Sequence, residues 1–444
     1  MDRRQFLGRS GRLLTGAAMM PLLPRLMCST ALAQQSGSSY KAIVCLYLSG
    51  GNDGNNTLIP TDQYYAEYAT GRQGLALPRA SLQTLSKAAS SGRTFGLHPA
   101  LSNVASLYNA GYASWLANTG PLTSPATKEA LIQGAPLPAG LFSHPDQSSE
   151  WQSGTTQSGS LSGWAGRLAD RLANTFNDGS VPMIVSTTGW SLLGAGNTNS
   201  AAAIGNGTNT VQVLNALQLL SPYLSRMGDT DASNHLLAEI AGMQSGMLTT
   251  TNALNQVIQA GANFSTAFPN TSIGNQLEAI AKSINGHSTG GASRQIFICS
   301  QPYYDTHTDQ LSFQQSNLAD LDAAVGAFAS AMKEVGMFDD VLLFTMSDFA
   351  RAEMPNTTGG TDHGWGNHHL VVGGAVKGGD VFGTFPSLIL GGDDDLKDTG
   401  LWIPTTSVSQ YAATLSTWLG AQSSDISSVF PELANFPSPL PKFV

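Results

Sequence analysis

The sequence is poor in cysteine, in charge and in long apolar runs. It has three cysteines in 444 residues, and 11% of its residues are charged. Two of the cysteines, Cys45 and Cys299, lie in apolar stretches. They are too few for a disulfide framework, although one disulfide between them is compatible with an oxidising compartment. No run outside the N-terminal segment is long enough to cross a bilayer as a helix. We therefore expect a domain held together by its apolar core.

Basic residues are especially scarce. The chain has 21 Lys and Arg against 30 Asp and Glu, a net charge of −9. Nucleic acids and anionic membranes attract basic patches, so we expect neither as a partner. The glycine-rich stretch 49–54 lacks the G-x-G-x-x-G spacing of a dinucleotide site. With no other cofactor fingerprint present, a redox protein is not favoured.

The N-terminus has the pattern of an export signal. Arg3-Arg4-Gln5-Phe6-Leu7-Gly8 is a twin-arginine motif, an apolar stretch runs from Leu13 to Leu23, and Ala31-Leu32-Ala33 is a cleavage site. A basic amphipathic helix of a cytosolic protein is the alternative. We predict that residues 1–33 are a signal peptide and that the mature protein is periplasmic or secreted. Cleavage would leave 16 Lys and Arg against 29 Asp and Glu, a formal charge of −13 with no membrane span.

Residues 34–444 are expected to form a single α/β domain. Buried parallel strands are predicted at four apolar runs: Lys41–Leu48, Pro182–Ser186, Gln295–Ser300 and Val341–Met346. Helical patterns lie between them, at Pro99–Tyr108, Gly163–Ala173 and Asn317–Val335. This alternation predicts a doubly wound, mostly parallel sheet. The segment from about 208 to 284 is helical in period throughout, which indicates a helical insertion.

Two polar motifs follow predicted strands. Parallel strands end at a common sheet edge, where α/β proteins place their sites. After the first strand, Asp53 of a Gly-Gly-Asn-Asp-Gly turn would enter that edge, and an ordinary turn is an equal alternative. After the third strand, Asp305, His307 and Asp309 would point to one side of an extended segment. A polar loop is the alternative there.

The richest stretch is Thr361–His369, which holds three of the eight histidines and follows the strand that ends at Ser347-Asp348. Asp348, Asp362, His363 and His368 are therefore candidate metal ligands. Oxygen and imidazole ligands suit Zn, Mn or Fe better than Ca. The alternative is a glycine-rich turn whose histidines bond backbone groups. Between these motifs, Arg351 could pair with a carboxylate or bind an anionic substrate.

A further candidate is the start of a predicted helix at Ser143-His144-Pro145-Asp146. Ser143 suits the N-cap position, and Pro145 and Asp146 suit the first turn. A helix N-terminus is also a natural anion site. Capping accounts for Ser143 and Asp146, but it leaves His144 unexplained.

Together these motifs resemble a known family. They occur in order with Leu97-His98-Pro99-Ala100-Leu101, with a glycine-rich stretch at 373–379 and with Trp402-Ile403-Pro404-Thr405-Thr406. The set is similar to the twin-arginine-exported bacterial family catalogued as domain of unknown function 1501. That family is similar in fold to the alkaline phosphatase and sulfatase superfamily. Its members hold metal ions at the carboxyl edge of a parallel sheet and hydrolyse phosphate or sulfate esters.

The resemblance implies roles for individual residues. The implied ligands of one or two divalent metal ions are Asp53, Asp305, His307, Asp348 and His363, with Asp362 and His368 as further candidates. A nucleophile is expected at a helix N-terminus, where this chain has His144, with Ser143 one residue earlier. The superfamily's Asp-His pair is Asp348-Phe349 here. His144 therefore either replaces the nucleophile or serves as a ligand in place of the missing histidine.

The leading hypothesis is an exported metal-dependent hydrolase of a phosphate or sulfate ester, or of a related anionic group. Ser143 would attack directly, or water would attack with His144 as acid and base. The chain lacks a Cys-x-Pro-x-Arg motif, so a standard sulfatase is not expected. The alternative is an exported binding or assembly protein, with a protein partner, that retains the fold, with or without the metal, and has lost turnover.

Overall fold

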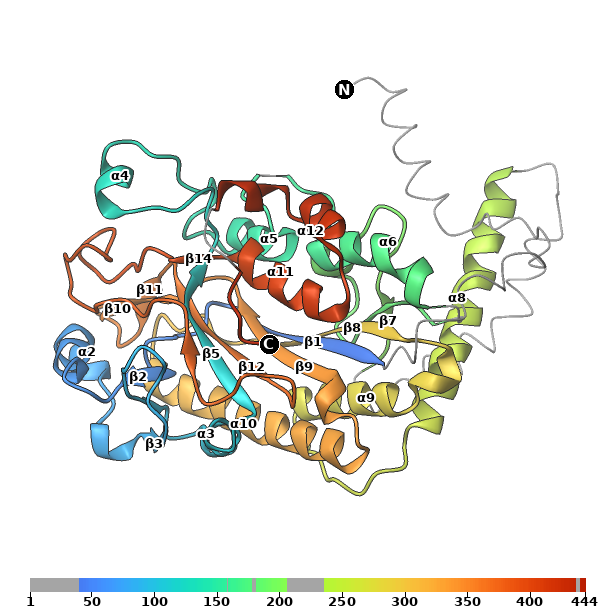
Figure 1. Cartoon of the computed structure of the whole chain (residues 1–444), viewed down its shortest axis with the longest axis horizontal. Helices are drawn as coiled ribbons and strands as arrows, with labels where there is room; N and C mark the ends of the chain where they lie inside the picture. Colours follow the sequence, from blue (N-terminus) through green and yellow to red (C-terminus); the bar gives the residue numbers. More distant parts are fainter. Residues whose placement is uncertain (1–39, 158, 178–180, 206–234, 437–439) are drawn as a thin grey trace.

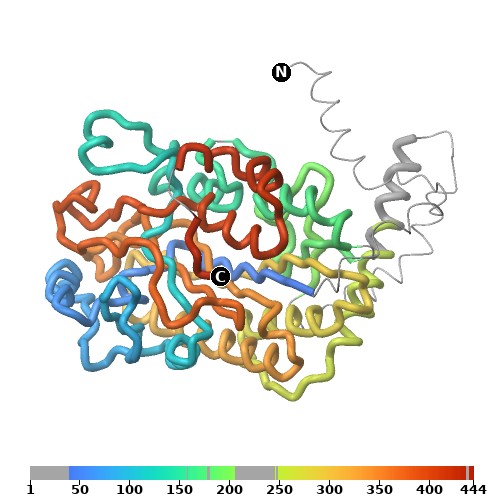
Figure 2. Tube along the Cα trace, viewed as in Figure 1, coloured from blue at the N-terminus to red at the C-terminus, as the bar shows by residue number. Residues whose placement is uncertain are grey.

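The computed structural model describes residues 40–157, 159–177, 181–205, 235–436 and 440–444 (Figure 2). The predicted signal peptide at residues 1–33 lies outside the described residues. Residues 206–234, the first part of the expected helical insertion, lie outside them as well.

A nine-stranded sheet forms the centre of the fold, in the order β13-β5-β12-β9-β1-β8-β6-β7 with β14 beside β5 (Figure 1). Its central strand β1 (Lys41–Leu48) runs parallel to both β8 (Arg294–Gln301) and β9 (Val341–Ser347). Only β12 (Asn367–Val372) runs antiparallel to its neighbours among the described strands of this sheet. The remaining strands are β5 (Ala113–Gly120), β6 (Ile184–Ser186), β7 (Ala202–Ala203), β13 (Val381–Phe382) and β14 (Thr406–Ser407). The predicted mostly parallel sheet is confirmed.

Helices cover both faces of this sheet (Figure 1). On one face lie α3 (Ser102–Asn109), α8 (His235–Ala260), α9 (Ser272–Asn285) and α10 (Gln310–Glu334). On the other lie α5 (His144–Ser153), α6 (Trp164–Phe176), α11 (Val408–Leu419) and α12 (Ser423–Val429). The layers are those of a doubly wound α/β fold.

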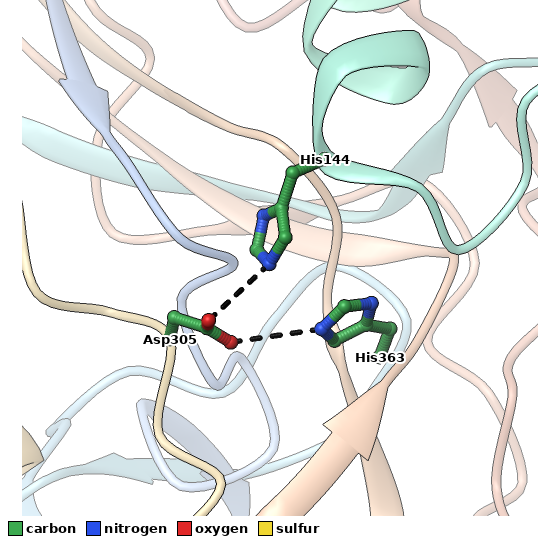
Figure 3. Close-up of side chains that lie close together, drawn as sticks. All are labelled: His144, Asp305 and His363. Carbon is green, nitrogen blue, oxygen red and sulfur yellow. Dashed lines mark ion pairs between the residues drawn. The ribbon is translucent and has the colours of Figure 1, made fainter.

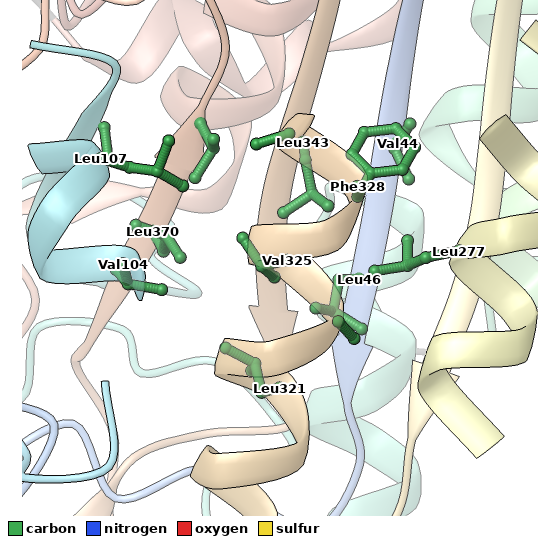
Figure 4. Close-up of a cluster of buried hydrophobic side chains, with 14 of the residues drawn as sticks. Val44, Leu46, Val104, Leu107, Leu277, Leu321, Val325, Phe328, Leu343 and Leu370 are labelled. Carbon is green, nitrogen blue, oxygen red and sulfur yellow. The ribbon is translucent and has the colours of Figure 1, made fainter. Parts of the chain in front are cut away.

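Strand β1 is apolar throughout because its alternate side chains enter two separate cores. Val44 and Leu46 pack with Leu277 of α9 and Phe328 of α10 on one face (Figure 4). Ile43, by contrast, belongs to the core on the opposite face, under α6 and α11. The unbroken apolar run in the sequence therefore marks a strand that is buried on both sides.

The described part of the expected insertion is helical, as predicted. Its second helix, α9, packs against α10 and β8. Gln276 of α9 donates a hydrogen bond from Nε2 to the carbonyl of Ser300 on β8, at 2.9 Å. Helix α9 is thus part of the layer that covers the sheet.

Cys45 and Cys299 are both free thiols. They lie on the adjacent strands β1 and β8, but Cys45 belongs to one core and Cys299 to the other. Burial raises the pKa of both thiols, so they behave as small apolar side chains. No helix among the described residues is long and apolar enough to span a membrane.

Two small sheets and two short helices lie around the main sheet. An antiparallel pair joins β10 (Arg351–Pro355) to β11 (Thr361–His363), with Arg351 opposite His363. The other small sheet has the order β2-β4-β3, made of Leu58–Pro60, Phe95–Leu97 and Gln83–Thr84. The short helices are α2 (Tyr65–Arg72) and α4 (Lys128–Ile132). The stretch 361–369 is therefore not one loop: it begins as β11 and ends inside β12.

Candidate metal centre

His144, Asp305 and His363 lie close together at the carboxyl edge of the main sheet (Figure 3), and His307 contacts the same aspartate. His144 is the first residue of α5, and His363 is the last residue of β11. Asp305 and His307 come from the segment between β8 and α10. Residues from three parts of the chain thus meet where three parallel strands end.

The distances within this group are short. The Asp305 carboxylate lies 3.4 Å from Nε2 of His144, 3.1 Å from Nε2 of His307 and 3.6 Å from Nε2 of His363. The Nε2 atoms of His307 and His363 are 2.9 Å apart. A tetrahedral ion with ligand bonds of about 2.0–2.1 Å would separate its donor atoms by about 3.3 Å. The ligand atoms of His144, Asp305 and His363 all lie within 4.8 Å of one another, so these three residues can share one ion, and His307 borders them.

The donor chemistry fits the same conclusion. Two imidazoles and one carboxylate, with the His307 imidazole beside them, form a set that suits Zn, Mn or Fe better than Ca. Nε2 of His144 is buried and makes no hydrogen bond to any described residue. A buried polar atom that makes no hydrogen bond is costly unless something binds it, and this one lies 3.4 Å from the Asp305 carboxylate without hydrogen-bond geometry. The residues present therefore fit a divalent cation.

Asp348 orients the His144 ring through its Nδ1 atom, which faces away from the centre. The Asp348 carboxylate is buried at the end of β9 and lies 2.7 Å from Nδ1 of His144. The same carboxylate accepts hydrogen bonds from the Tyr47 hydroxyl at 2.7 Å and from the Gly50 N–H at 3.2 Å. An acceptor at Nδ1 keeps the proton there and turns the lone pair of Nε2 inward. Asp348, which we predicted as a ligand, contacts one ligand instead of the centre itself.

The other two imidazoles also face acceptors. Nδ1 of His363 lies 2.7 Å from the carbonyl oxygen of Phe142, a residue with a φ of 69°. Nδ1 of His307 lies 3.5 Å from a carboxylate oxygen of the exposed Asp362. Burial lowers the pKa of His363, and the charge of Arg351 adds to this, while the hydrogen bond to Phe142 opposes it. The outcome favours the neutral imidazole, which is the form that binds metals.

Arg351 supports the carboxylate of the group. Its buried guanidinium pairs with Asp305 and also donates to the carbonyls of Gly51 and Thr361, at 3.0 and 3.1 Å. Burial alone would raise the pKa of Asp305, but the hydrogen bond and charge of Arg351 lower it below its ordinary value. Of the two roles predicted for Arg351, the structure shows the pairing with a carboxylate.

The glycine-rich turn after β1 allows these groups to approach one another. Gly50 and Gly51 have φ values of +114° and +85°, in the left-handed region. A Cβ at Gly50 would collide with the backbone nitrogen of Asp305, and one at Gly51 would meet the ring of Phe349 at 2.5 Å. The Phe349 ring in turn packs on His144, with ring centroids 4.6 Å apart. The turn therefore requires glycine at both positions.

Asp53 lies apart from the four residues. It is buried, forms an ion pair with Arg72 and accepts hydrogen bonds from Gln310 and from the Asn55 N–H. Burial raises the pKa of Asp53, while the charge of Arg72 lowers it. The structure does not bring this predicted ligand to the centre, because protein donors already occupy its oxygens. Arg72 and Gln310 carried no motif of their own, and sequence reasoning missed both.

His368 is also separate from the centre. It lies on β12, where its side chain is buried, and its ring stacks on Phe385 with centroids 4.5 Å apart. Its Nδ1 accepts a hydrogen bond from the Asn118 N–H at 3.0 Å. Burial lowers the pKa of His368 to about 3. The antiparallel strand carries this residue back into the sheet, and only His363 of the three clustered histidines reaches the centre.

Ser143 is the N-cap residue of α5, as predicted. Its hydroxyl does not cap the helix; it donates to the carboxylate of Asp146 at 2.6 Å. The next residue, His144, projects its ring into the centre (Figure 3). Of the two roles left open for His144, the geometry matches that of a ligand.

Fold and site together define an α/β protein that gathers histidine and carboxylate side chains at the carboxyl edge of a mostly parallel sheet. Within that class, the chain belongs to the family described as "Protein of unknown function (DUF1501)", which matches residues 40–399. The family expected from the sequence motifs is therefore confirmed.

Solved structures with similarity to this chain include sulfatases and phosphatases. The PsFucS1 sulfatase from Pseudoalteromonas sp. is 12% identical, with 86% of this chain and 68% of that one covered and a TM-score of 0.35. Ps i-CgsB in complex with k-i-k-neocarrahexaose is 10% identical, with 86% of this chain and 72% of that one covered and a TM-score of 0.33. A mutant of the alkaline phosphatase PafA is 11% identical, with 72% of this chain and 64% of that one covered and a TM-score of 0.28. No curated protein matches the sequence. Because these sequence identities and TM-scores are low, the function has to be argued from the side chains of this chain.

Proposed function

We propose that this protein is an exported metal-dependent hydrolase of a phosphate or sulfate ester, or of a related anionic group. The observation that carries the proposal is the convergence of three imidazole Nε2 atoms on the Asp305 carboxylate. Export is inferred from the twin-arginine motif at Arg3-Arg4. A divalent cation bound by these residues would polarise an ester oxygen and lower the pKa of a water molecule beside it.

The protein's own groups prepare the site for this chemistry. Arg351 keeps Asp305 ionised. Asp348 holds the proton of His144 on Nδ1, so the lone pair of Nε2 faces the centre. The Phe142 carbonyl does the same for His363. Asp305, His144 and His363 are thus each held in place by a neighbouring group, which pre-organises these three ligands for one cation.

Water is the nucleophile that this arrangement favours. The Ser143 hydroxyl is engaged by Asp146, and His144 has one ring nitrogen on Asp348 and the other aimed at the centre. His144 therefore acts as a ligand and leaves no free nitrogen for acid and base catalysis. Because the oxygens of Asp53 are occupied by Arg72 and its other donors, we infer one ion and not two.

A second candidate function is an exported binding or assembly protein that holds the metal without turnover. Two observations favour it. A histidine stands at the N-terminus of α5, where a nucleophilic hydroxyl would be expected, and Asp53 is neutralised by a buried arginine. In that case the metal would stabilise the edge of the sheet for a protein partner.

One experiment separates these functions. The metal content of the purified protein would be measured by plasma mass spectrometry, beside His363→Ala and Asp305→Ala and an Asp393→Asn control at an exposed position. Each protein would then be assayed with 4-nitrophenyl phosphate and 4-nitrophenyl sulfate after incubation with Zn, Mn or Fe. We expect one equivalent of metal and turnover in wild type and control, and neither in the two ligand variants.

The other outcomes are equally informative. One bound equivalent without turnover on either ester would favour the binding protein. A folded wild-type protein that takes up no metal would contradict the hydrolase and would leave a binding protein that has lost the metal.

A further inference from the structure

A cleft of about 660 Å³ opens beside the candidate metal centre. Its size is within the range of sites that enclose small organic molecules, about 300–1,000 Å³. The ligand candidates His307 and His363 form part of its wall. The other lining residues are Phe142, Ala352, Met354, Pro355, Asn356, Thr357, Asp362, Lys397, Thr399 and Leu401.

The far wall of this cleft is held rigidly. Asp395 is fully buried and accepts backbone hydrogen bonds from Lys397, Gly400 and Leu401, at 3.2, 2.9 and 2.9 Å. The segment also pairs with β10, since the Met354 N–H donates to the carbonyl of Thr399 at 3.0 Å. Both walls are therefore pre-formed, which lowers the cost of binding a ligand between them.

The cleft combines an apolar wall with one lysine, and the exposed carboxylate of Asp362 also lines it. Phe142, Met354 and Leu401 supply apolar surface. The Lys397 ammonium lies 5.2 Å from the centre of the Phe142 ring. The carbonyl of that same Phe142 accepts a hydrogen bond from the ring of His363, so Lys397 and His363 both contact Phe142. Lysine is the only basic side chain type among the lining residues apart from histidine.

We propose that the cleft binds the organic part of a small amphiphilic ester, an aryl or alkyl ester of a tetrahedral oxyanion. The apolar group packs against Phe142 and Met354, and Lys397 pairs with the anionic group next to the centre. This substrate class rests on the proposed hydrolase function, because the ester would have to meet the metal centre at the end of the cleft. Phosphate and sulfate share the required chemistry, and the test below distinguishes them.

The test uses phenylphosphonate, which cannot be hydrolysed, and isothermal titration calorimetry of the metal-loaded protein. Three variants are compared with wild type: Lys397→Gln, Met354→Gln and, as a control at an exposed lysine outside the cleft, Lys442→Gln. We expect Lys397→Gln to weaken phenylphosphonate binding at least about tenfold. Met354→Gln should weaken phenylphosphonate about fivefold while leaving methylphosphonate unchanged, because only the aryl ring reaches the apolar wall. Lys442→Gln should bind as wild type does.

Phenylsulfonate, titrated in parallel, reports which oxyanion is preferred. Equal binding of phenylphosphonate by wild type, Lys397→Gln and Met354→Gln would overturn the proposal, even if the protein hydrolyses esters. Conversely, Lys397-dependent binding in a protein without turnover would support the cleft and contradict the hydrolase. The two proposals therefore fail separately.

Discussion

The Nε2 atoms of His307 and His363 lie 2.9 Å apart, although 56 positions separate the two residues in the chain. The carbonyl of Phe142 holds the proton of His363 on Nδ1, so its Nε2 presents a lone pair to its neighbour. Two imidazole nitrogens at this distance either share a hydrogen bond, with the proton on Nε2 of His307, or face a common cation. Because Asp305 and His144 are adjacent, a cation bound by them could also bind the imidazole nitrogens of His307 and His363.

Removing the metal should therefore destabilise the protein. A ligand that binds the folded state alone stabilises it by about 2.7 kcal/mol when its free concentration is 100 times its Kd. We expect the melting temperature to fall when Zn-loaded protein is treated with a chelator, and to recover when Zn is restored. A His307→Ala, His363→Ala double variant should show the same melting temperature with and without Zn. An unchanged melting temperature in wild type would argue against a bound cation.

Asp348 should act on the metal through His144. We predict that Asp348→Asn lowers the affinity for Zn by about 10- to 100-fold, as is usual for groups that orient a metal-binding histidine. Ser148→Ala is the matched control, because Ser148 contacts the Tyr47 hydroxyl at 2.8 Å and the Gln152 amide at 2.9 Å but makes no hydrogen bond to His144 or Asp348. Competition with a chromophoric chelator measures both affinities. Loss of all metal in Asp348→Asn would instead identify Asp348 as a direct ligand.

The fold could be predicted from the sequence because its central strands are continuous apolar runs. Strand β1 has the bounds predicted, Lys41–Leu48, since burial on both faces leaves an unbroken apolar run. The same pattern located β8 and β9 within one residue at each end. Since parallel strands end at a common edge, the polar residues just after them, such as Asp305 and His307, could be expected to meet there.

The residues around the centre were harder to foresee, and the reasons are physical. Asp53 follows a strand as a ligand would, but its role is decided by Arg72, whose side chain reaches it from a helix. His368 sits in a histidine-rich stretch, yet the antiparallel strand β12 buries it. Phe142 orients His363 through a backbone carbonyl, which leaves no trace in the side-chain pattern. Long-range pairing and backbone acceptors are therefore what the pattern could not indicate.

The buried pair formed by Asp53 and Arg72 allows a test of whether Asp53 is an ion-pair partner or a metal ligand. Both side chains are buried, so Asp53→Asn would leave the charge of Arg72 less well compensated. Breaking a buried ion pair in this way costs about 3–5 kcal/mol. We expect a loss of that order in the free energy of unfolding by urea, with the metal content unchanged. Loss of the metal with stability preserved would show that Asp53 is a ligand after all.

Glu150 should make the stability of the protein depend on pH. It lies on α5, the helix that presents His144, and its Oε2 is buried with no hydrogen bond to any described residue. Burial raises the pKa of Glu150 from its ordinary 4.5 to about 8. Between these two values the folded state holds a proton that the unfolded chain has released. The contribution of Glu150 to stability is therefore present below pH 4.5 and is lost as the pH rises towards 8.

The Glu150→Gln variant isolates this effect, because glutamine resembles the protonated acid and does not titrate. The free energy of unfolding would be measured by urea titration at pH 5, 6, 7 and 8 for both proteins. We expect the difference between variant and wild type to move in favour of the variant as the pH rises, by at most about 1.4 kcal/mol per pH unit. Above pH 8 the difference should level off, because the glutamate is then ionised in both states. A difference that stays constant from pH 5 to pH 8 would show that Glu150 is ionised in the folded protein throughout.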